Sequence, residues 1–320
     1  MAVYTPVSAE AMAALLALYD AGTLVSAKGI AEGVENSNFL IETDRSRFIL
    51  TLYEKRVDAA DLPFFLQLLD HLADRGNPVP RAVPDRMGTQ IQEVAGRPAC
   101  LIEYLSGVSV SHPTPGQAQA AGAALGRMHE GLKDFTAERP NTLGPDGWRA
   151  LAAKCGTDLD RIAPGLGGRV ANEIALIDAH WPLGLARSVI HADLFPDNVL
   201  MLGERVTGII DFYFACTEVR AWDLAVTHSA WCFDSDGSTY YADRASGLVA
   251  GYDESFGLSD AERDAFAILA RGACLRFLLT RAWDWLNTPA DAIVTRKDPL
   301  AFLRRLDFYA RADAAELLGA

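Results

Sequence analysis

The chain has 320 residues, 50% of them hydrophobic, which is enough to bury a full core and predicts two lobes. Its 42 acidic residues outnumber its 29 basic ones, and the net charge of −13 argues against nucleic acid or an anionic membrane as the main partner. The five cysteines are scattered and form no C-x-x-C pair, so reduced thiols and a cytoplasmic location are expected. No apolar run approaches about 18 residues and no signal-peptide pattern opens the chain, so no membrane segment is expected.

The first hundred residues predict a small, mostly antiparallel sheet with one or two helices. Ser8 is a candidate N-cap for an amphipathic helix, and residues 62–72 repeat the helical spacing of apolar side chains. The segment from Lys28 to Asn38 is rich in turn residues. Two strand pairs separated by turn signals are predicted, with strands at 39–41, 48–53, 88–94 and 99–105.

The pattern becomes mainly helical after residue 106. Thr114 and Gln117 form a candidate capping box at the start of a helix. Further long helical stretches are predicted at 222–231, 240–252, 261–285 and 299–318. The sequence therefore predicts an α+β protein with a small antiparallel β lobe, residues 1–104, and a larger, mostly helical lobe, residues 105–320.

A further short hairpin follows residue 198 and carries polar side chains at its open end. Its strands are predicted at 199–202 and 206–210, so opposed residue numbers sum to about 408. Asn198 and Asp211 then face each other, close enough for two oxygen ligands to share one Mg²⁺. Asp193 lies on the loop that enters the hairpin, where a base for an attacking hydroxyl is needed. The arrangement predicts phosphoryl transfer, with Asp193 as catalytic base.

Two neighbouring residues are expected to support this loop. His191 is expected to hold the catalytic loop through hydrogen bonds rather than to take part in the chemistry. Asp223, near the start of the next helix, either stabilises the helix N-terminus or accepts backbone N–H bonds from the catalytic loop, and the second interpretation is favoured. Any one of these polar residues alone would be an ordinary loop residue.

The segment 29–38 is a candidate phosphate-covering turn, with an ordinary β-turn as the alternative. Its glycines allow close approach of the backbone, and no Walker A pattern occurs in the chain. The candidate nucleotide contacts in this segment are Gly33, Asn36, Ser37 and Asn38.

A basic side chain should reach the nucleotide phosphates from the strand that follows. Lys55, at the end of that strand, is the candidate, while Arg56 and Lys28 compete with it. A solvated strand end is the alternative interpretation for Lys55.

The apolar stretch 268–286 contains arginines that need partners. Arg276 shares a helical face with Asp284, so a structural Arg–Asp pair is one interpretation. In the other, Arg276 or Arg281 binds a substrate carboxylate through two hydrogen bonds. Tyr213 is a further candidate for contact with the substrate.

The motif His191-x-Asp193-x₄-Asn198, followed by Ile210-Asp211-Phe212, resembles the aminoglycoside phosphotransferase/choline kinase superfamily, which has a protein-kinase-like bilobal fold. Within that superfamily the chain resembles the bacterial homoserine kinase family from Tyr4 to about Leu306. The segments that carry this closer resemblance are 33–38, 49–56, 61–66, 191–199, 210–216, 230–233 and 276–281.

The resemblance implies ATP-dependent phosphorylation of the side-chain hydroxyl of L-homoserine in threonine biosynthesis, with Mg²⁺ as cofactor. It implies Asp193 as base, Asn198 and Asp211 as Mg²⁺ ligands, and Glu103-Tyr104 as the interlobe hinge whose backbone meets adenine. A monomer or a homodimer is expected. A kinase of the same fold acting on an aminoglycoside, choline or methylthioribose is the alternative enzyme, and a catalytically inactive nucleotide-binding member is the alternative from another class.

Overall fold

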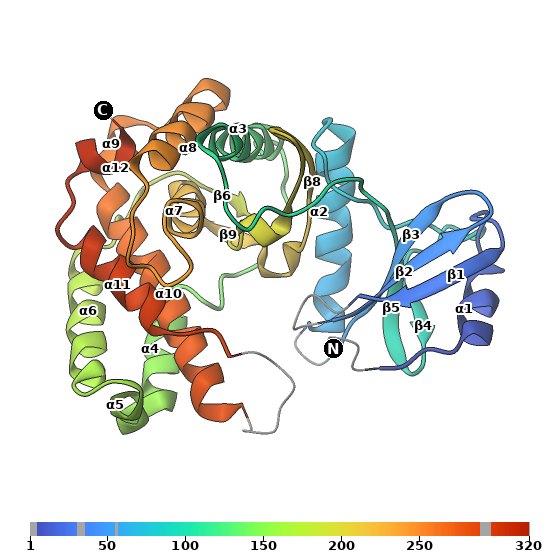
Figure 1. Cartoon of the computed structure of the whole chain (residues 1–320), viewed down its shortest axis with the longest axis horizontal. Helices are drawn as coiled ribbons and strands as arrows, with labels where there is room; N and C mark the ends of the chain where they lie inside the picture. The colour runs from blue at the N-terminus through green and yellow to red at the C-terminus, as the bar shows by residue number, and fades with distance from the viewer. Residues whose placement is uncertain (1–4, 31–35, 55–56, 289–295, 320) are drawn as a thin grey trace. The chain divides into compact units, whose positions relative to one another are not determined.

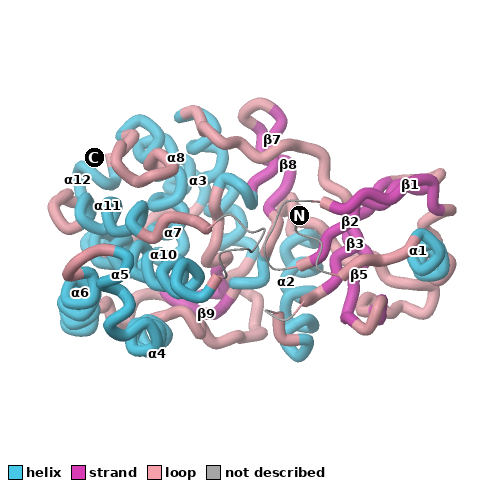
Figure 2. The backbone as a smooth tube through the Cα atoms, turned by 60° about the horizontal axis from the view of Figure 1, so that its bottom comes forward, coloured by secondary structure: helices cyan, strands magenta, loops and turns pink. Residues whose placement is uncertain are grey.

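The computed structural model describes residues 5–30, 36–54, 57–288 and 296–319. The chain forms two compact units, residues 1–106 and 107–320. The first unit contains a sheet and two longer helices, whereas helices predominate in the second, as Figures 1 and 2 show. The predicted α+β class is confirmed.

The first unit is built on a five-stranded antiparallel sheet with strand order β1-β2-β3-β5-β4. Alternate residues of β2 are buried, as its apolar spacing predicts. Strand β1 was not predicted, because its residues are mostly exposed and its main tie to the sheet is backbone pairing with β2. The strands are β1 (Leu24–Gly29), β2 (Ser37–Thr43), β3 (Arg47–Leu52), β4 (Gln92–Val94) and β5 (Arg97–Glu103).

Helix α1 (Ala9–Leu16) covers part of this sheet. The predicted N-cap is confirmed, because the Ser8 hydroxyl accepts the N–H of Ala11 at 3.2 Å. Met12, Leu15 and Leu16 belong to one apolar core with buried side chains of β2, β3 and β5. Helix α2 (Leu62–Asp74) buries a stripe of leucines and Phe65.

The second unit contains ten α-helices among its described residues, with two short strand pairs between them. Strand β6 (Arg187–Ile190) pairs with β9 (Cys216–Val219), and β7 (Val199–Leu202) pairs with β8 (Arg205–Ile209). The helices are α3 (Pro115–Gly131), α4 (Pro145–Cys155), α5 (Leu159–Ile162), α6 (Leu166–His180), α7 (Arg220–Trp231), α8 (Ala242–Ser255), α9 (Asp260–Asp264), α10 (Phe266–Asn287), α11 (Leu300–Tyr309) and α12 (Ala314–Leu318).

Two helices predicted as continuous are each divided in two. The stretch 261–285 is interrupted at Ala265, between α9 and α10, and the stretch 299–318 is interrupted between α11 and α12. A local cap begins the new helix in the second case, because the Asp313 carboxylate accepts the N–H of Glu316 at 2.8 Å. The apolar periodicity on both sides hid these breaks.

Helices α3 and α8 approach so closely that glycine is required at their contact. A Cβ atom added to Gly122 would lie 1.9 Å from the Leu248 carbonyl oxygen, and one added to Gly251 would lie 2.0 Å from that of Gln119. Backbone atoms cannot move aside as a flexible side chain does, so these glycines fix the distance between the two helices.

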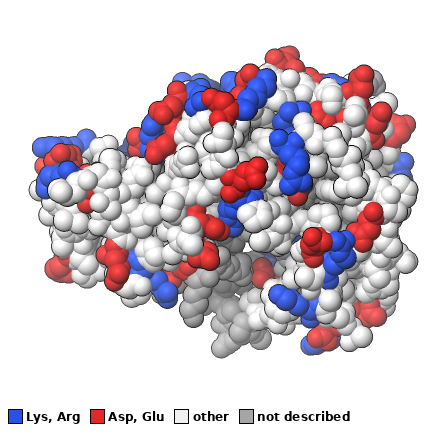
Figure 3. All heavy atoms as spheres, turned by 180° about the vertical axis from the view of Figure 1, so that it is seen from behind, with Lys and Arg blue, Asp and Glu red and all other residues white. Residues whose placement is uncertain are grey.

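All five cysteines are buried free thiols, as predicted. Within the described part of the chain, no helix is long and apolar enough to cross a membrane. The face drawn in Figure 3 carries acidic and basic side chains interspersed among neutral ones.

His228 ties α7 to the C-terminal helices. Its ring is fully buried, with Nδ1 2.6 Å from the Tyr309 hydroxyl and Nε2 3.1 Å from the Leu317 carbonyl oxygen. The carbonyl can only accept, so Nε2 carries the proton and Nδ1 accepts from the hydroxyl. Burial lowers the pKa of His228 to about 4.

This pKa predicts a loss of stability in mild acid. The unfolded chain protonates His228 near pH 6.5, whereas the folded chain keeps it neutral down to about pH 4. The contribution of His228 to the free energy of unfolding is therefore fully present above pH 6.5 and is lost as the pH falls toward 4. Between pH 7.5 and 5 the contribution is about 2 kcal/mol. Urea denaturation of the wild type and of His228→Gln at both pH values measures it, and the variant should lose most of this difference. Exposed His112→Gln is the matched control, and an equal pH dependence in all three proteins would contradict the prediction.

Candidate active site

The β7–β8 hairpin brings Asn198 and Asp211 to one end of its ladder. Val199 pairs with Ile209, and the N–H of Ile210 donates to the Asn198 carbonyl at 3.0 Å. Asp211 is the next residue. Gly203 makes the turn with φ +64°. The predicted register at the open end is therefore confirmed to within one residue, although β8 begins at Arg205 rather than at 206.

Asn198 also contacts the predicted base. Its amide nitrogen donates to the Asp193 carbonyl at 2.8 Å and to a carboxylate oxygen of Asp193 at 3.3 Å. Since the nitrogen is directed at Asp193, the amide oxygen of Asn198 is the atom left to meet a cation. The structure thus brings Asp193 and Asn198 into direct contact, with Asp211 one residue beyond the ladder.

His191 supports the loop as expected. Its Nε2 lies 3.0 Å from the Ile210 carbonyl oxygen, and its Nδ1 accepts the N–H of Asp193 at 3.2 Å. Burial, the largest influence, lowers the pKa of His191. The ring is therefore neutral with the proton on Nε2, and it links the residue before Asp211 to the base itself.

Asp223 in α7 binds the catalytic loop, as the favoured interpretation predicted. Its two carboxylate oxygens accept the backbone N–H groups of His191 and Ala192, each at 2.8 Å. His129 in α3 donates to the same carboxylate at 3.1 Å, and its other ring nitrogen lies 2.9 Å from the Tyr252 hydroxyl. Burial acts to raise the pKa of Asp223, but the hydrogen bonds from His129 and the loop outweigh it, and the net pKa is lowered.

Arg276 in α10 holds the other side of the same loop residue. Its guanidinium is 2% exposed and donates to the Ala192 carbonyl, and it lies over the ring of Phe277 at 4.7 Å. Ala192 has φ +63°, a left-handed conformation that costs an alanine energy. Asp223 and Arg276 therefore fix Ala192 through its N–H and its carbonyl, so Arg276 positions the loop. This contact was not predicted from the sequence.

Asp211 also has a left-handed backbone, with φ +67°. It precedes a short 3₁₀ turn, Phe212–Phe214, and the Phe212 ring lies 4.5 Å from the ring of His191. Tyr213, a predicted substrate contact, lies in this turn and is half-buried.

The donor atoms at this end of the hairpin suit Mg²⁺. An amide oxygen and a carboxylate are the hard oxygen ligands this ion prefers, and it keeps further positions for phosphate oxygens and water. Among the described residues, no three His, Cys, Asp or Glu side chains gather as a metal cluster, here or elsewhere. Asn198 and Asp211 offer donor atoms of the kind that could hold a nucleotide-bound Mg²⁺.

In the first unit, the predicted phosphate donors are engaged within the sheet. The Asn36 side chain accepts the N–H of Glu54 at 3.3 Å, and the Ser37 hydroxyl donates to the Glu54 carboxylate at 2.8 Å. Asn38 accepts from the Thr51 hydroxyl at 2.8 Å. These side chains fix β2 to β3 and the residues beyond it. Gly33 and Lys55 lie outside the described residues.

The predicted hinge lies where β5 ends. The N–H of Glu103 donates to the Arg81 carbonyl at 2.9 Å, so this donor is already engaged within the unit. Tyr104 is half-buried, and the guanidinium carbon of Arg47 lies 4.3 Å from the centre of the Tyr104 ring. The division between the two units follows at residues 106 and 107.

Arg281 contacts α11 and the segment that precedes it. It is half-buried in α10, donates to the Asp298 carbonyl at 3.2 Å and lies 4.5 Å over the Phe302 ring. Burial, followed by the charge of Arg305, lowers the pKa of Arg281 to about 10, while the negative charge of Asp193 opposes this shift. Of the predicted substrate contacts, Arg281 and Tyr213 are accessible, whereas Arg276 is enclosed.

The whole chain is similar to known enzymes. Residues 26–258 match the sequence model of the phosphotransferase enzyme family. A homoserine kinase of Zymomonas mobilis is 56% identical over 99% of both chains. Another, of Xanthobacter autotrophicus, is 50% identical over 100% of this chain and 99% of its own.

Solved structures share the fold at low identity. An amicoumacin kinase in complex with AMP-PNP and Ca²⁺ has a TM-score of 0.71 at 14% identity, covering 96% of this chain and 95% of its own. A spectinomycin phosphotransferase in complex with ADP scores 0.69 at 13% identity, with 99% of each chain covered. A choline kinase of Cryptosporidium parvum scores 0.65 at 14% identity, covering 89% and 88%. The predicted protein-kinase-like fold is confirmed.

Asp223→Asn is expected to lower kcat of phosphoryl transfer about a hundredfold. An amide has one acceptor oxygen, whereas each of two backbone N–H groups of the loop needs its own acceptor. The loop would therefore shift, and a small displacement of the base lowers the rate strongly. KM values should change less than about threefold. Steady-state kinetics measures both. Ser229→Ala, which removes a buried hydrogen bond within the same helix, is the control and should keep wild-type kcat. An Asp223→Asn enzyme that is folded and has wild-type kcat would refute the positioning role.

Proposed function

The chain belongs to the homoserine kinases of the phosphotransferase enzyme family, and from this premise we propose that it transfers the γ-phosphoryl group of ATP to the side-chain hydroxyl of L-homoserine. The products are O-phospho-L-homoserine and ADP, and the reaction serves threonine biosynthesis. The observation that carries the proposal is 56% identity to a homoserine kinase along 99% of both chains. The cluster of Asp193, Asn198 and Asp211 supports the chemistry.

The proposed step forms a bond between the homoserine oxygen and the γ-phosphorus and breaks the bond between that phosphorus and the β,γ-bridging oxygen of ATP. Asp193 orients the hydroxyl and accepts its proton late in the transfer. Asn198 and Asp211 would hold Mg²⁺, which when bound would neutralise charge on the phosphate oxygens. His191 remains neutral and orients the loop.

We assign the two lobes different tasks. The first, residues 1–104, binds the nucleotide through the segment Gly33 to Asn38, a basic residue at Lys55, and the backbone near Glu103 and Tyr104. The second, residues 105–320, binds the acceptor and carries out the transfer. The enzyme works in the cytoplasm as a monomer or homodimer, with no nucleic acid or membrane as partner.

A kinase of choline, an aminoglycoside or methylthioribose is the competing function. The cited solved structures of kinases that act on other small molecules are 12–19% identical to this chain, a level of similarity that informs on fold alone. The homoserine kinases are 48–56% identical along nearly the whole chain, so homoserine is favoured.

Asp193→Asn tests the chemistry. An amide cannot accept the hydroxyl proton, so ATP turnover should fall at least about a thousandfold, while nucleotide affinity should be preserved. Coupled measurement of ADP release gives the rate and titration with ADP gives the affinity. Asp197→Asn, a change of the same kind at an exposed position on the same loop, is the control and should leave the rate within about threefold. A rate unchanged by Asp193→Asn would remove Asp193 as the base.

An acceptor panel tests the substrate. ADP release is measured with L-homoserine, choline, 5-methylthioribose and kanamycin at matched concentrations. We expect kcat/KM for homoserine to exceed the others more than about tenfold, because discrimination of this size needs only about 1.4 kcal/mol of differential transition-state binding. Equal rates across the panel, or a higher rate with another acceptor, would overturn the assignment.

A further inference from the structure

Two arginines from successive helices share one aromatic ring close to the catalytic loop. The guanidinium carbons of Arg281 in α10 and Arg305 in α11 lie 4.5 and 4.4 Å from the centre of the Phe302 ring. Phe302 lies 4.9 Å from Phe277 and 6.2 Å from Phe195, which follows Asp193 by two residues in the chain. The pair of cations is therefore built onto the same aromatic cluster as the loop that carries the base.

Both guanidinium groups bind backbone carbonyls. Arg281 donates to the Asp298 carbonyl at 3.2 Å, and Arg305 donates to the Asp234 carbonyl at 2.7 Å. Among the described residues, no carboxylate lies within ion-pair distance of either arginine. Arg305 is 4% exposed, so this is a buried cation whose charge is not matched by an adjacent anion.

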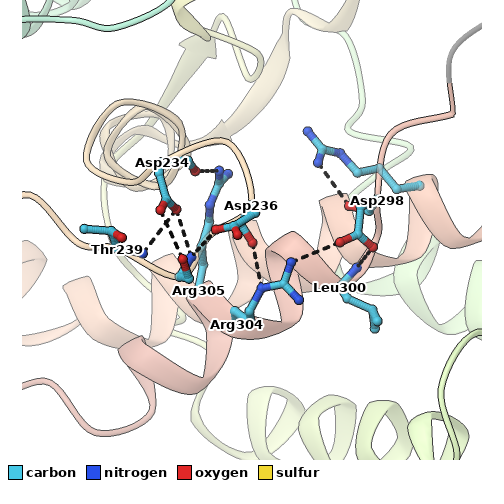
Figure 4. Close-up of polar contacts among 9 residues, drawn as sticks. Asp234, Asp236, Thr239, Asp298, Leu300, Arg304 and Arg305 are labelled. Carbon is cyan, nitrogen blue, oxygen red and sulfur yellow. Dashed lines mark hydrogen bonds and ion pairs between the residues drawn. The ribbon is translucent and has the colours of Figure 1, made fainter.

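The nearby acids are directed elsewhere, as Figure 4 shows. The Asp298 carboxylate pairs with Arg304 at 3.0 Å. The Asp234 carboxylate accepts from the N–H groups of Ser238 and Thr239 at 2.8 and 3.1 Å. These bonds lower the pKa of Asp234 against the effect of burial. The Asp234 and Asp298 carboxylates are thus engaged by groups other than Arg281 and Arg305. The positive charge of these two arginines is left for a ligand.

We propose that Arg281, with Arg305 behind it, binds the α-carboxylate of the amino acid acceptor and so selects amino acids over other alcohols. The inference rests on the proposed function and adds the residue that determines acceptor class. Four bonds separate the carboxylate carbon of homoserine from its hydroxyl oxygen, a span of about 5 Å when extended. Arg281 covers the Phe302 ring, which lies 6.2 Å from the ring of Phe195, two residues after Asp193, so a carboxylate held at Arg281 lies on the same aromatic cluster as the loop that carries the base.

The same anion site would also suit the transferred phosphoryl group. The two ligands have different consequences, because loss of a carboxylate contact acts on ligands that carry the carboxylate, whereas loss of a phosphoryl contact lowers kcat for every acceptor.

Two competitive inhibitors separate these possibilities. L-2-aminobutyrate keeps the carboxylate and amine of homoserine without the hydroxyl, while 3-aminopropan-1-ol keeps the hydroxyl and amine without the carboxylate. In Arg281→Gln we expect KM for homoserine and the inhibition constant of L-2-aminobutyrate to rise about a hundredfold, as befits loss of a partly buried charge pair. The inhibition constant of 3-aminopropan-1-ol and KM for ATP should stay within about threefold. Arg281→Lys should recover part of the homoserine affinity.

Arg304→Gln is the matched control. Arg304 lies on α11 beside Arg305, donates to the Asp236 carbonyl at 2.7 Å and pairs with Asp298, so its removal tests whether loosening these loops alone weakens acceptor binding. We expect all constants to remain within about threefold. Equal weakening of both inhibitors in Arg281→Gln, or a fall in kcat with KM unchanged, would overturn the carboxylate assignment. A wild-type enzyme that does not phosphorylate homoserine would instead overturn the proposed function.

Discussion

The geometry of the site depends on one buried carboxylate. Asp223 is fully buried, and its oxygens accept two consecutive backbone N–H groups of the catalytic loop. Burying a carboxylate is unfavourable unless hydrogen bonds replace its water, and here His129 adds a third bond. Because both N–H groups belong to the turn that precedes Asp193, the position of the base follows from that of a helix residue 30 positions later in the chain.

Two side chains of opposite charge bind the N–H and the carbonyl of Ala192, which has a left-handed backbone conformation. The anion of Asp223 meets its N–H, and the cation of Arg276 meets its carbonyl. The two groups belong to the peptide units on either side of Ala192, so a buried anion and a buried cation each receive a backbone hydrogen-bond partner from one residue. An alanine keeps φ +63° here because its N–H and its carbonyl are both bound by buried, charged side chains.

Local features of the site and the contact of Asp223 with the catalytic loop were predicted from the sequence, whereas the contacts of His129 and Arg276 were not. The hairpin register followed from strand spacing and a turn at Gly203, which are properties of neighbouring residues. The Asp223–His129 bond joins residues 94 positions apart, and the contact of Arg276 with Ala192 joins residues 84 apart. No periodicity encodes such pairs. The breaks at Ala265 and after α11 were missed for another reason, since apolar residues continue on both sides of each break, although Asp313 caps the new helix in the second case.

The arginines of α10 show why residue type alone could not assign their roles. Arg271, Arg276 and Arg281 recur every five residues, and each step of five turns the helix by about 140°. The three side chains therefore leave the helix in different directions. Arg271 forms a two-point ion pair with Glu173 of α6, at 2.6 and 2.8 Å, and Arg276 holds the catalytic loop. Arg281 alone of the three combines partial exposure with the influence of Asp193. One helix thus pairs with α6, holds the catalytic loop and carries a partly exposed cation against α11, and the spacing of its arginines makes these contacts compatible.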